Sequence, residues 1–169
     1  MLTSGVVQTI PDKLRSSYSA MRERERKVMK KIIFATGNAG KMKEIREILA
    51  DLPVEIYSMK EAGIAVEINE NGTTFEENAK IKAQTVAGCV DGDTIVLADD
   101  SGLEVDALNG EPGVYSARYM GEDTSYRIKN KSLVDRLEGV PAEKRTARFV
   151  CVIAAAFPDG SICTTRGTI

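Results

Sequence analysis

The sequence predicts an α/β fold in which helices flank the faces of a mixed β-sheet. Three observations indicate this: strand-like and helix-like segments alternate over residues 31–98, a two-strand hairpin follows near the end, and 43% of the residues are hydrophobic. Alternating strands and helices favour parallel pairing, and a hairpin adds an antiparallel pair. The 169 residues are sufficient for one domain with a sizeable core.

The first half of this domain alternates between strands and helices. KIIFAT over 31–36 is a β-branched apolar run, and VEIYS over 54–58 has the alternation of a strand. Between them, KMKEIREILADL carries apolar residues at helical spacing and stops before a proline. A second helix is predicted over 75–90, because Thr74 and Glu77 have the spacing of a capping box at its start.

The second half contains the longest apolar segments. TIVLA over 94–98 predicts the most buried strand, and a pair of aspartates follows it directly. A polar helix is expected across 124–138. TARFVCVIAAAF over 146–157, a Pro-Asp-Gly turn and SICTTRGTI over 161–169 then predict a hairpin.

The residue counts exclude several kinds of chemistry. The chain has no histidine, so a Ser-His-Asp relay, an imidazole-ligated zinc and a histidine general base are all excluded. The scattered cysteines Cys89, Cys151 and Cys163 form no CxxC pair and are expected to be buried thiols in a reducing compartment. No apolar run reaches the length of a membrane span, and no signal-peptide core follows Met1, which together predict a cytoplasmic protein with no membrane contact.

Charge divides the chain near its thirtieth residue. Residues 1–31 hold eight basic and three acidic residues, whereas the remainder holds 15 basic and 22 acidic ones. We therefore predict a charged, flexible extension over 1–30 and a folded domain over 31–169. A contact with nucleic acid or an anionic membrane is one interpretation of the extension. An appended leader before Met29 is the favoured one, so no specific nucleic-acid partner is predicted.

The segment TGNAGK, from Thr36 to Lys41, connects the first predicted strand to the first helix. Its glycines allow a tight turn with outward-facing amides, and the helix N-terminus attracts anions. Lys41 adds a mobile positive charge that suits a phosphate. A Walker A loop is excluded, because Met42 stands where Ser or Thr is required. The alternatives at this point are a phosphate site and an ordinary strand–helix turn.

Carboxylates gather near the carboxyl end of the predicted buried strand. In DDSG over 99–102, two adjacent aspartates would hold a divalent cation and orient water, since ligands bind at such strand ends. The alternative is a turn in which Asp and Ser bond local amides. Glu70, in the loop before the second helix, would complete a hard-metal site with Asp99 or Asp100. Lys82 would face the same cleft from that helix.

Five blocks of sequence carry a resemblance to a known family. ATGNAGK, TTFEENA, LADDSGL, PGVYSARY and TARFVC resemble, in order and spacing, the inosine triphosphate pyrophosphatase family, whose members hydrolyse non-standard purine nucleoside triphosphates. The resemblance covers residues 31–169. It implies an elongated α/β fold, two-lobed with a central cleft, usually as a homodimer. The implied reaction converts XTP, ITP or dITP to the monophosphate and pyrophosphate with Mg²⁺.

The resemblance also implies roles for individual residues. Those expected to contact the substrate are Thr36, Gly37, Asn38, Ala39, Gly40, Lys41, Lys82 and Ser101. Those expected to hold Mg²⁺ are Glu70 and Asp100, with Asp99 close by. Asp100 would also accept the proton of the attacking water, and Lys41 would join it as a catalytic residue. A carboxylate base is strong enough where a metal lowers the pKa of water.

Two features depart from the family's pattern. The extension before Met29 is not part of it, and the family's C-terminal glycine-aromatic-Tyr-Asp-Pro segment and Ser-His-Arg motif are absent. We therefore expect a C-terminally truncated domain that binds Mg²⁺-triphosphate weakly and distinguishes dITP from dGTP poorly. The alternative function is a catalytically impaired fragment that binds nucleotide phosphates or pairs with a full-length subunit. Nucleic-acid binding through the extension is a third, weaker hypothesis.

Overall fold

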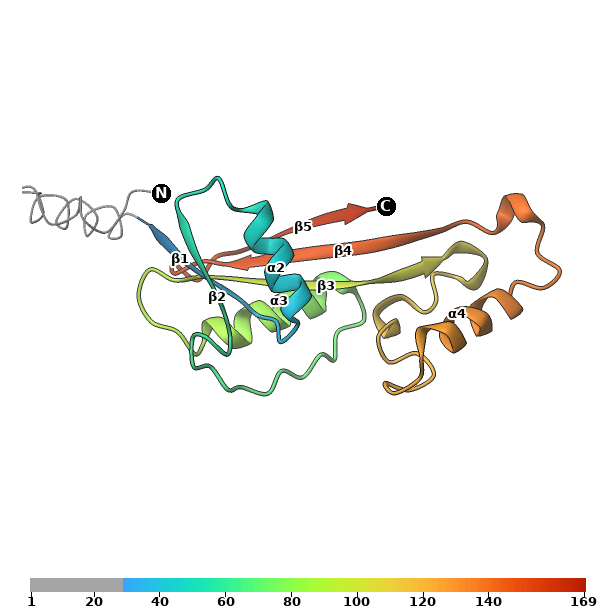
Figure 1. Ribbon diagram of the computed structural model, residues 1–169, viewed down its shortest axis with the longest axis horizontal. Helices are drawn as coiled ribbons and strands as arrows, with labels where there is room; N and C mark the ends of the chain where they lie inside the picture. Colours follow the sequence, from blue (N-terminus) through green and yellow to red (C-terminus); the bar gives the residue numbers. More distant parts are fainter. Residues whose placement is uncertain (1–28) are drawn as a thin grey trace, which may run out of the picture.

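The computed structural model describes residues 29–169, and the predicted extension up to residue 28 lies outside this part. Its centre is a five-stranded sheet with the order β2-β1-β3-β4-β5 (Figure 1). The strands are β1 (Lys30–Phe34), β2 (Val54–Ser58), β3 (Ile95–Val105), β4 (Ala147–Ala156) and β5 (Ile162–Thr168). β1 pairs in parallel with β2 and β3, and β4 pairs antiparallel with β3 and β5. The predicted mixed α/β sheet and its hairpin are therefore confirmed.

The helical elements follow the predicted order. The α-helices of the described part are α2 (Ala39–Ile48), α3 (Phe75–Ala87) and α4 (Tyr126–Asp135), with short 3₁₀ helices η2 (Asp106–Leu108), η3 (Gly113–Tyr115) and η4 (Ala142–Lys144). The capping box that starts α3 is confirmed. The Glu77 amide donates to Thr74 Oγ1 at 3.1 Å, and the Glu77 carboxylate accepts from the Thr74 amide at 3.2 Å. Two otherwise unpaired amides are thereby satisfied.

α2 is shorter and less buried than the sequence predicted. It ends at Ile48 instead of continuing to the proline, and Met42 is its one buried residue. Ile48 and Leu52 expose 73% and 53% of their surface. After the helix the chain turns towards β2, and the Lys30 amide donates to the carbonyl of Pro53 at 3.3 Å.

β3 is longer than the sequence predicted, and this changes the setting of the aspartates. Its pairing with β1 stops at Phe34↔Leu97, whereas its pairing with β4 continues to Val105↔Ala147. Figure 1 shows the β3–β4 pair running from the body of the sheet towards α4. DDSG therefore lies inside a strand, and the interpretation of these residues as a turn is wrong. A glycine is needed at position 102, because a Cβ there would lie 2.5 Å from the carbonyl oxygen of Gly113.

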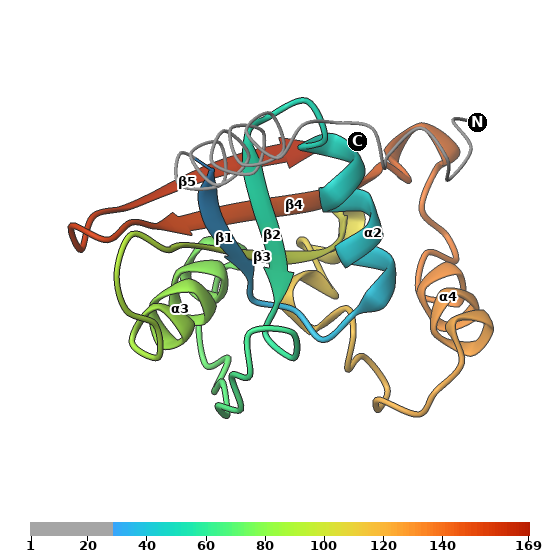
Figure 2. The same ribbon diagram turned by 60° about the vertical axis from the view of Figure 1, so that its left-hand side comes forward.

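The core consists of two hydrophobic clusters. The larger one packs α3 against one face of the sheet and comprises Ile33, Ala35, Phe75, Ala79, Ala83, Val86, Val96, Ala98, Val150, Val152, Ala154 and Ala156. The smaller one joins the far end of β3 to α4 through Val105, Leu108 and Leu133. In Figure 2 these two helices lie at opposite ends of the molecule, joined by the β3–β4 pair.

The cysteines do not belong to either cluster. All three are free and exposed, so the expectation that they are buried is wrong. For Cys151 the reason is strand alternation: Val150 and Val152 point towards α3, and Cys151 between them points to the other face of the sheet. No helix within residues 29–169 has the length and hydropathy needed to cross a bilayer.

Candidate active site

The glycine loop joins the carboxyl end of β1 to the start of α2. Asn38 caps this helix, because its Oδ1 accepts from the amides of Gly40 at 2.8 Å and Lys41 at 3.3 Å. The main-chain amide of Asn38 in turn donates to Thr36 Oγ1 at 3.1 Å. Gly37 and Ala39 complete the loop, and both are exposed. The positive end of the α2 dipole is thus presented to solvent, an arrangement that attracts anions.

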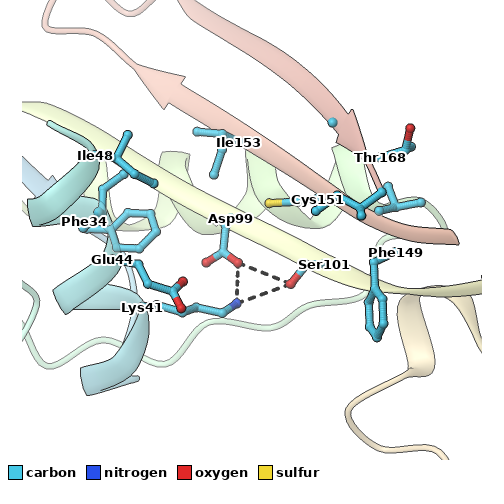
Figure 3. A pocket seen from close by; sticks show the side chains of 14 residues that line it. Phe34, Lys41, Glu44, Ile48, Asp99, Ser101, Phe149, Cys151, Ile153 and Thr168 are labelled. Carbon is cyan, nitrogen blue, oxygen red and sulfur yellow. Dashed lines mark hydrogen bonds and ion pairs between the residues drawn. The ribbon is translucent and has the colours of Figure 1, made fainter.

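Lys41 extends from the first turn of α2 towards β3. Its ammonium forms an ion pair with the carboxylate of Asp99 and lies 3.5 Å from Ser101 Oγ. Figure 3 shows Asp99 and Ser101 pointing from the same face of β3 towards Lys41. The Asp99 side chain is only 8% exposed, whereas that of Lys41 is 37% exposed. The ammonium can therefore reach a ligand in solvent without a change in the backbone.

Lys82 reaches Asp100 from α3, on the opposite face of β3. Its Nζ lies 3.2 Å from Asp100 Oδ1 and 2.9 Å from Glu70 Oε2, and donates to the main-chain oxygen of Asp99 at 3.1 Å. Burial by itself lowers the pKa of Lys82, but the hydrogen bond to Glu70 and the charge of Asp100 outweigh it, and the pKa is raised. Lys82 is therefore an ammonium at neutral pH.

Strand alternation separates the two aspartates that the sequence places side by side. Asp99 faces α2 and Asp100 faces α3, so their carboxylates do not act as one pair. Among residues 29–169, no group of three or more carboxylate, thiol or imidazole side chains converges to hold a metal. The structure instead brings together two carboxylates, those of Glu70 and Asp100, and one main-chain oxygen. Mg²⁺ is commonly held by one or two carboxylates together with substrate phosphates.

Asn78 lies in the candidate site, although no role was predicted for it from the sequence. It is fully buried, its Nδ2 donates to Asp100 Oδ2 at 3.2 Å, and its Oδ1 accepts from the Gly72 amide at 2.8 Å. A Cβ at position 72 would lie 2.6 Å from this Oδ1, so the loop needs a glycine there. The available signal was spacing, because Asn78 and Lys82 stand four residues apart and share one face of α3.

A groove of about 410 Å³ begins at Lys41, Asp99 and Ser101 and continues between α2, β4 and the end of β5. Its wall is largely apolar and includes Ile48 and Phe149, as Figure 3 shows. A charged end and an apolar wall suit a ligand with an anionic tail and an apolar body.

Cys151 is the thiol in the wall of this groove. Although Cys151 is exposed overall, partial burial against the groove wall raises its pKa, and the charge of Asp99 raises it further. The group is therefore a neutral thiol at neutral pH, which makes it a poor nucleophile.

Comparison with known proteins identifies relatives of this chain. The model of the Ham1 family matches residues 32–169. A dITP/XTP pyrophosphatase of Exiguobacterium sibiricum is 49% identical over 139 residues, which are 82% of this chain and 69% of the relative. The dITP/XTP pyrophosphatase of Thermoanaerobacter pseudethanolicus is 56% identical over 124 residues, which are 73% of this chain and 62% of the relative. The resemblance predicted from the five sequence blocks is confirmed.

Solved structures agree with the sequence comparison. The Ham1 protein of Staphylococcus aureus has a TM-score of 0.73 at 40% identity, over 83% of this chain and 70% of that one. A HAM1 protein of Coxiella burnetii has a TM-score of 0.73 at 35% identity, over 83% of this chain and 71% of that one. The arrangement of strands and helices described above is therefore shared with these proteins.

Proposed function

We infer that this chain, which belongs to the Ham1 family, hydrolyses non-standard purine nucleoside triphosphates to the monophosphate and pyrophosphate. The inference rests on one observation. The glycine loop after β1 lies near two lysines, Lys41 and Lys82, and near the carboxylates with which they pair. The relatives at 49% and 56% identity are named for action on dITP and XTP. Hydrolysis of such nucleotides keeps them from being incorporated into nucleic acids.

We propose that the triphosphate binds at the start of α2. The loop from Thr36 to Gly40 offers a capped helix N-terminus, and Lys41 and Lys82 offer ammonium groups from the two faces of β3. Ser101 adds a hydroxyl beside Lys41. Because phosphate oxygens are dense in negative charge, this convergence of donors favours a triphosphate over a monophosphate.

Mg²⁺ is the proposed cofactor, held by Glu70 and Asp100. The carboxylate of Asp99, which was expected close by, faces α2 and pairs with Lys41, so only its main-chain oxygen lies on this side of β3. The proposal is supported by the oxygens around the Lys82 ammonium. These oxygens already bind one positive charge, that of Lys82 itself. Oxygen donors are those that Mg²⁺ prefers. When bound, Mg²⁺ neutralises phosphate charge and lowers the pKa of water.

Asp100 is the proposed proton acceptor. It is 8% exposed, and Asn78 fixes one of its oxygens, so its carboxylate has a defined orientation. Water attacks the triphosphate, its proton passes to Asp100, and the anhydride linkage between the α- and β-phosphates breaks to release pyrophosphate. Lys41 completes the proposed catalytic set by placing positive charge beside the phosphates.

A pyrophosphate-release assay on the 169-residue chain tests this function. We expect release from dITP with Mg²⁺, and its loss when EDTA removes the metal. The comparison with dGTP in the same assay measures base selectivity. Binding of dITP without release of pyrophosphate contradicts the proposed reaction and supports a non-catalytic nucleotide-binding protein instead.

We also propose that the protein acts as a homodimer. The support is that several large apolar side chains on and near α4 are exposed to solvent, namely Tyr115, Met120, Tyr126, Ile128 and Val134. Light scattering after size-exclusion chromatography measures the molecular mass in solution. A monomeric mass at micromolar concentration contradicts this part of the proposal.

A cytoplasmic location is proposed from the state of the thiols. Cys89, Cys151 and Cys163 are all free, as is typical of proteins in reducing compartments. Cell fractionation with an antibody against this chain tests the location.

A further inference from the structure

The ammonium of Lys82 lies where a cation held by Glu70 and Asp100 would have to bind. Its Nζ is 2.9 Å from Glu70 Oε2, 3.2 Å from Asp100 Oδ1 and 3.1 Å from the main-chain oxygen of Asp99. The Lys82 side chain is only 14% exposed, so the ammonium is enclosed by these oxygens and is not a surface group. The other oxygen of Asp100 is engaged by Asn78.

One set of oxygens cannot serve an ammonium and a divalent cation at the same time. Mg²⁺ needs its oxygens at about 2.0–2.1 Å and accepts little departure from octahedral geometry. An ammonium hydrogen-bonded to the same lone pairs blocks that approach, and two positive charges so close together repel each other. Lys82 therefore has to leave before a metal can be held by Glu70 and Asp100.

We propose that Lys82 is a displaceable internal cation that closes the metal site of the substrate-free protein and moves to the substrate phosphates when Mg²⁺ enters. This inference rests on the proposed metal site. Glu70 and Asp100 carry two negative charges against one on Lys82, so exchange for Mg²⁺ neutralises the pair and frees an ammonium. The flexible four-carbon stem of lysine allows its head group to move while the helix stays fixed.

A coupling between ligands follows from this exchange. Without a nucleotide, metal entry takes the Lys82 ammonium from its three oxygen partners and offers it no anionic partner in return, which is unfavourable. With a triphosphate present, the phosphate oxygens receive it. Metal and triphosphate therefore each strengthen the binding of the other, as reciprocal linkage requires.

Metal titration of the substrate-free protein tests the proposal. Mn²⁺ is titrated by calorimetry into the unaltered chain and into Lys82→Met, which retains the length of the side chain without its charge. We expect Lys82→Met to bind Mn²⁺ at least tenfold more tightly. Lys80→Met is the matched control, because Lys80 lies on the same helix but pairs with Glu76 at 2.8 Å, and its affinity should be unchanged. Glu70→Gln should weaken binding in both backgrounds.

Equal or weaker Mn²⁺ binding by Lys82→Met overturns the proposal. Binding that Glu70→Gln leaves unchanged overturns it as well, because the metal then lies elsewhere. Absence of Mn²⁺ binding in both proteins overturns the exchange together with the proposed metal site. None of these results decides the hydrolytic reaction, which the pyrophosphate-release assay measures separately.

A second measurement uses the unaltered chain and does not depend on the folding of a variant. Brief acetylation with acetic anhydride, followed by peptide mass spectrometry, reports the accessibility of each lysine amine. In the absence of a triphosphate, we expect Mg²⁺ to increase the labelling of Lys82 at least threefold and to leave that of Lys80 unchanged. Labelling of Lys82 that stays constant or falls on addition of Mg²⁺ overturns the proposal.

Discussion

The two faces of β3 hold neighbouring aspartates in very different surroundings. On the α3 face, Asp100 contacts a fully buried asparagine and a lysine that is 14% exposed. On the α2 face, Asp99 contacts a lysine that is 37% exposed, at the end of an open groove. α3 buries five of its residues against the sheet, whereas α2 buries only Met42. The packing of the α3 face is therefore fixed before a ligand arrives, with the head group of Lys82 as its proposed moving part, whereas the α2 face is open to a ligand.

The largest effect is expected from the two aspartates themselves. Asp100→Asn retains the shape of the side chain but removes the proposed base, so turnover of dITP should fall by roughly 10²–10⁴-fold. Asp99→Asn, on the other face, should cause a loss of turnover that is smaller by a factor of about ten or more. The Asp99 carboxylate pairs with Lys41 and does not face Glu70. Pyrophosphate release measures both, with circular dichroism as the test of folding. Equal losses in the two variants contradict the division between the faces.

Lys41→Ala should weaken triphosphate binding by roughly 1.5–3 kcal/mol, the usual size of a charged hydrogen bond. Monophosphate binding should weaken much less, because a lost ammonium matters most where phosphate charge is densest. Calorimetry with both ligands measures the difference. The control is Lys43→Ala, on the same helix, whose side chain is 79% exposed and pairs with Glu47. Equal weakening for the two ligands places Lys41 away from the polyphosphate.

Stability separates the two faces in a different way. Asn78→Ala leaves buried polar groups of Asp100 and Gly72 without a partner, which should lower the free energy of unfolding by about 1–3 kcal/mol. Ser101→Ala, on the exposed α2 face, should stay within about 0.5 kcal/mol of the unaltered chain. Urea unfolding measures both values. A Ser101→Ala variant as unstable as Asn78→Ala would show that the α2 face is also fixed by packing.

The sequence predicted most of the fold because its strands and caps are local signals. VEIYS became β2 with the predicted bounds, and the Thr74–Glu77 spacing located the start of α3. The length of β3 could not be predicted in this way, because its second half depends on pairing with β4, about fifty residues later in the chain. The same pairing determines that Asp99 and Asp100 face opposite ways. The sequence therefore places the two aspartates side by side but does not predict that one faces α2 and the other α3.

For Asn78 the sequence offers only the spacing that places it on the same face of α3 as Lys82, and not its hydrogen-bond partners. Its bonds to Asp100 and Gly72 join a helix, a strand and a loop that are brought together only by the tertiary fold. The exposure of Cys151 has a similar cause, because its apolar neighbours in β4 predict burial while α3 covers only one face of the sheet. Local patterns report which residues alternate, and packing decides which of the two faces is covered.

The last and smallest effect concerns the outer side of α2, which is held by ionic contacts at the protein surface. Glu61 accepts from the amide of Ser58 at 2.7 Å and from its hydroxyl at 2.9 Å, and it forms an ion pair with Arg46 of α2 at 2.7 Å. The Ser58 amide, followed by Arg46, lowers the pKa of Glu61 from 4.5 to about 2. The carboxylate thus ties the outer side of α2 to the end of β2.

The pH dependence of stability tests this anchor. Because the pKa of Glu61 is lower in the folded state, its contribution is present above pH 4.5 and is lost as the pH falls from 4.5 to about 2. Glu61→Gln removes the charge at every pH, so it should lower the urea midpoint at neutral pH and converge with the unaltered chain near pH 2. The effect should be small, since the group is exposed to solvent. A difference that stays constant down to about pH 2 would show that the ionised carboxylate does not anchor α2, and that the two helices differ in burial alone.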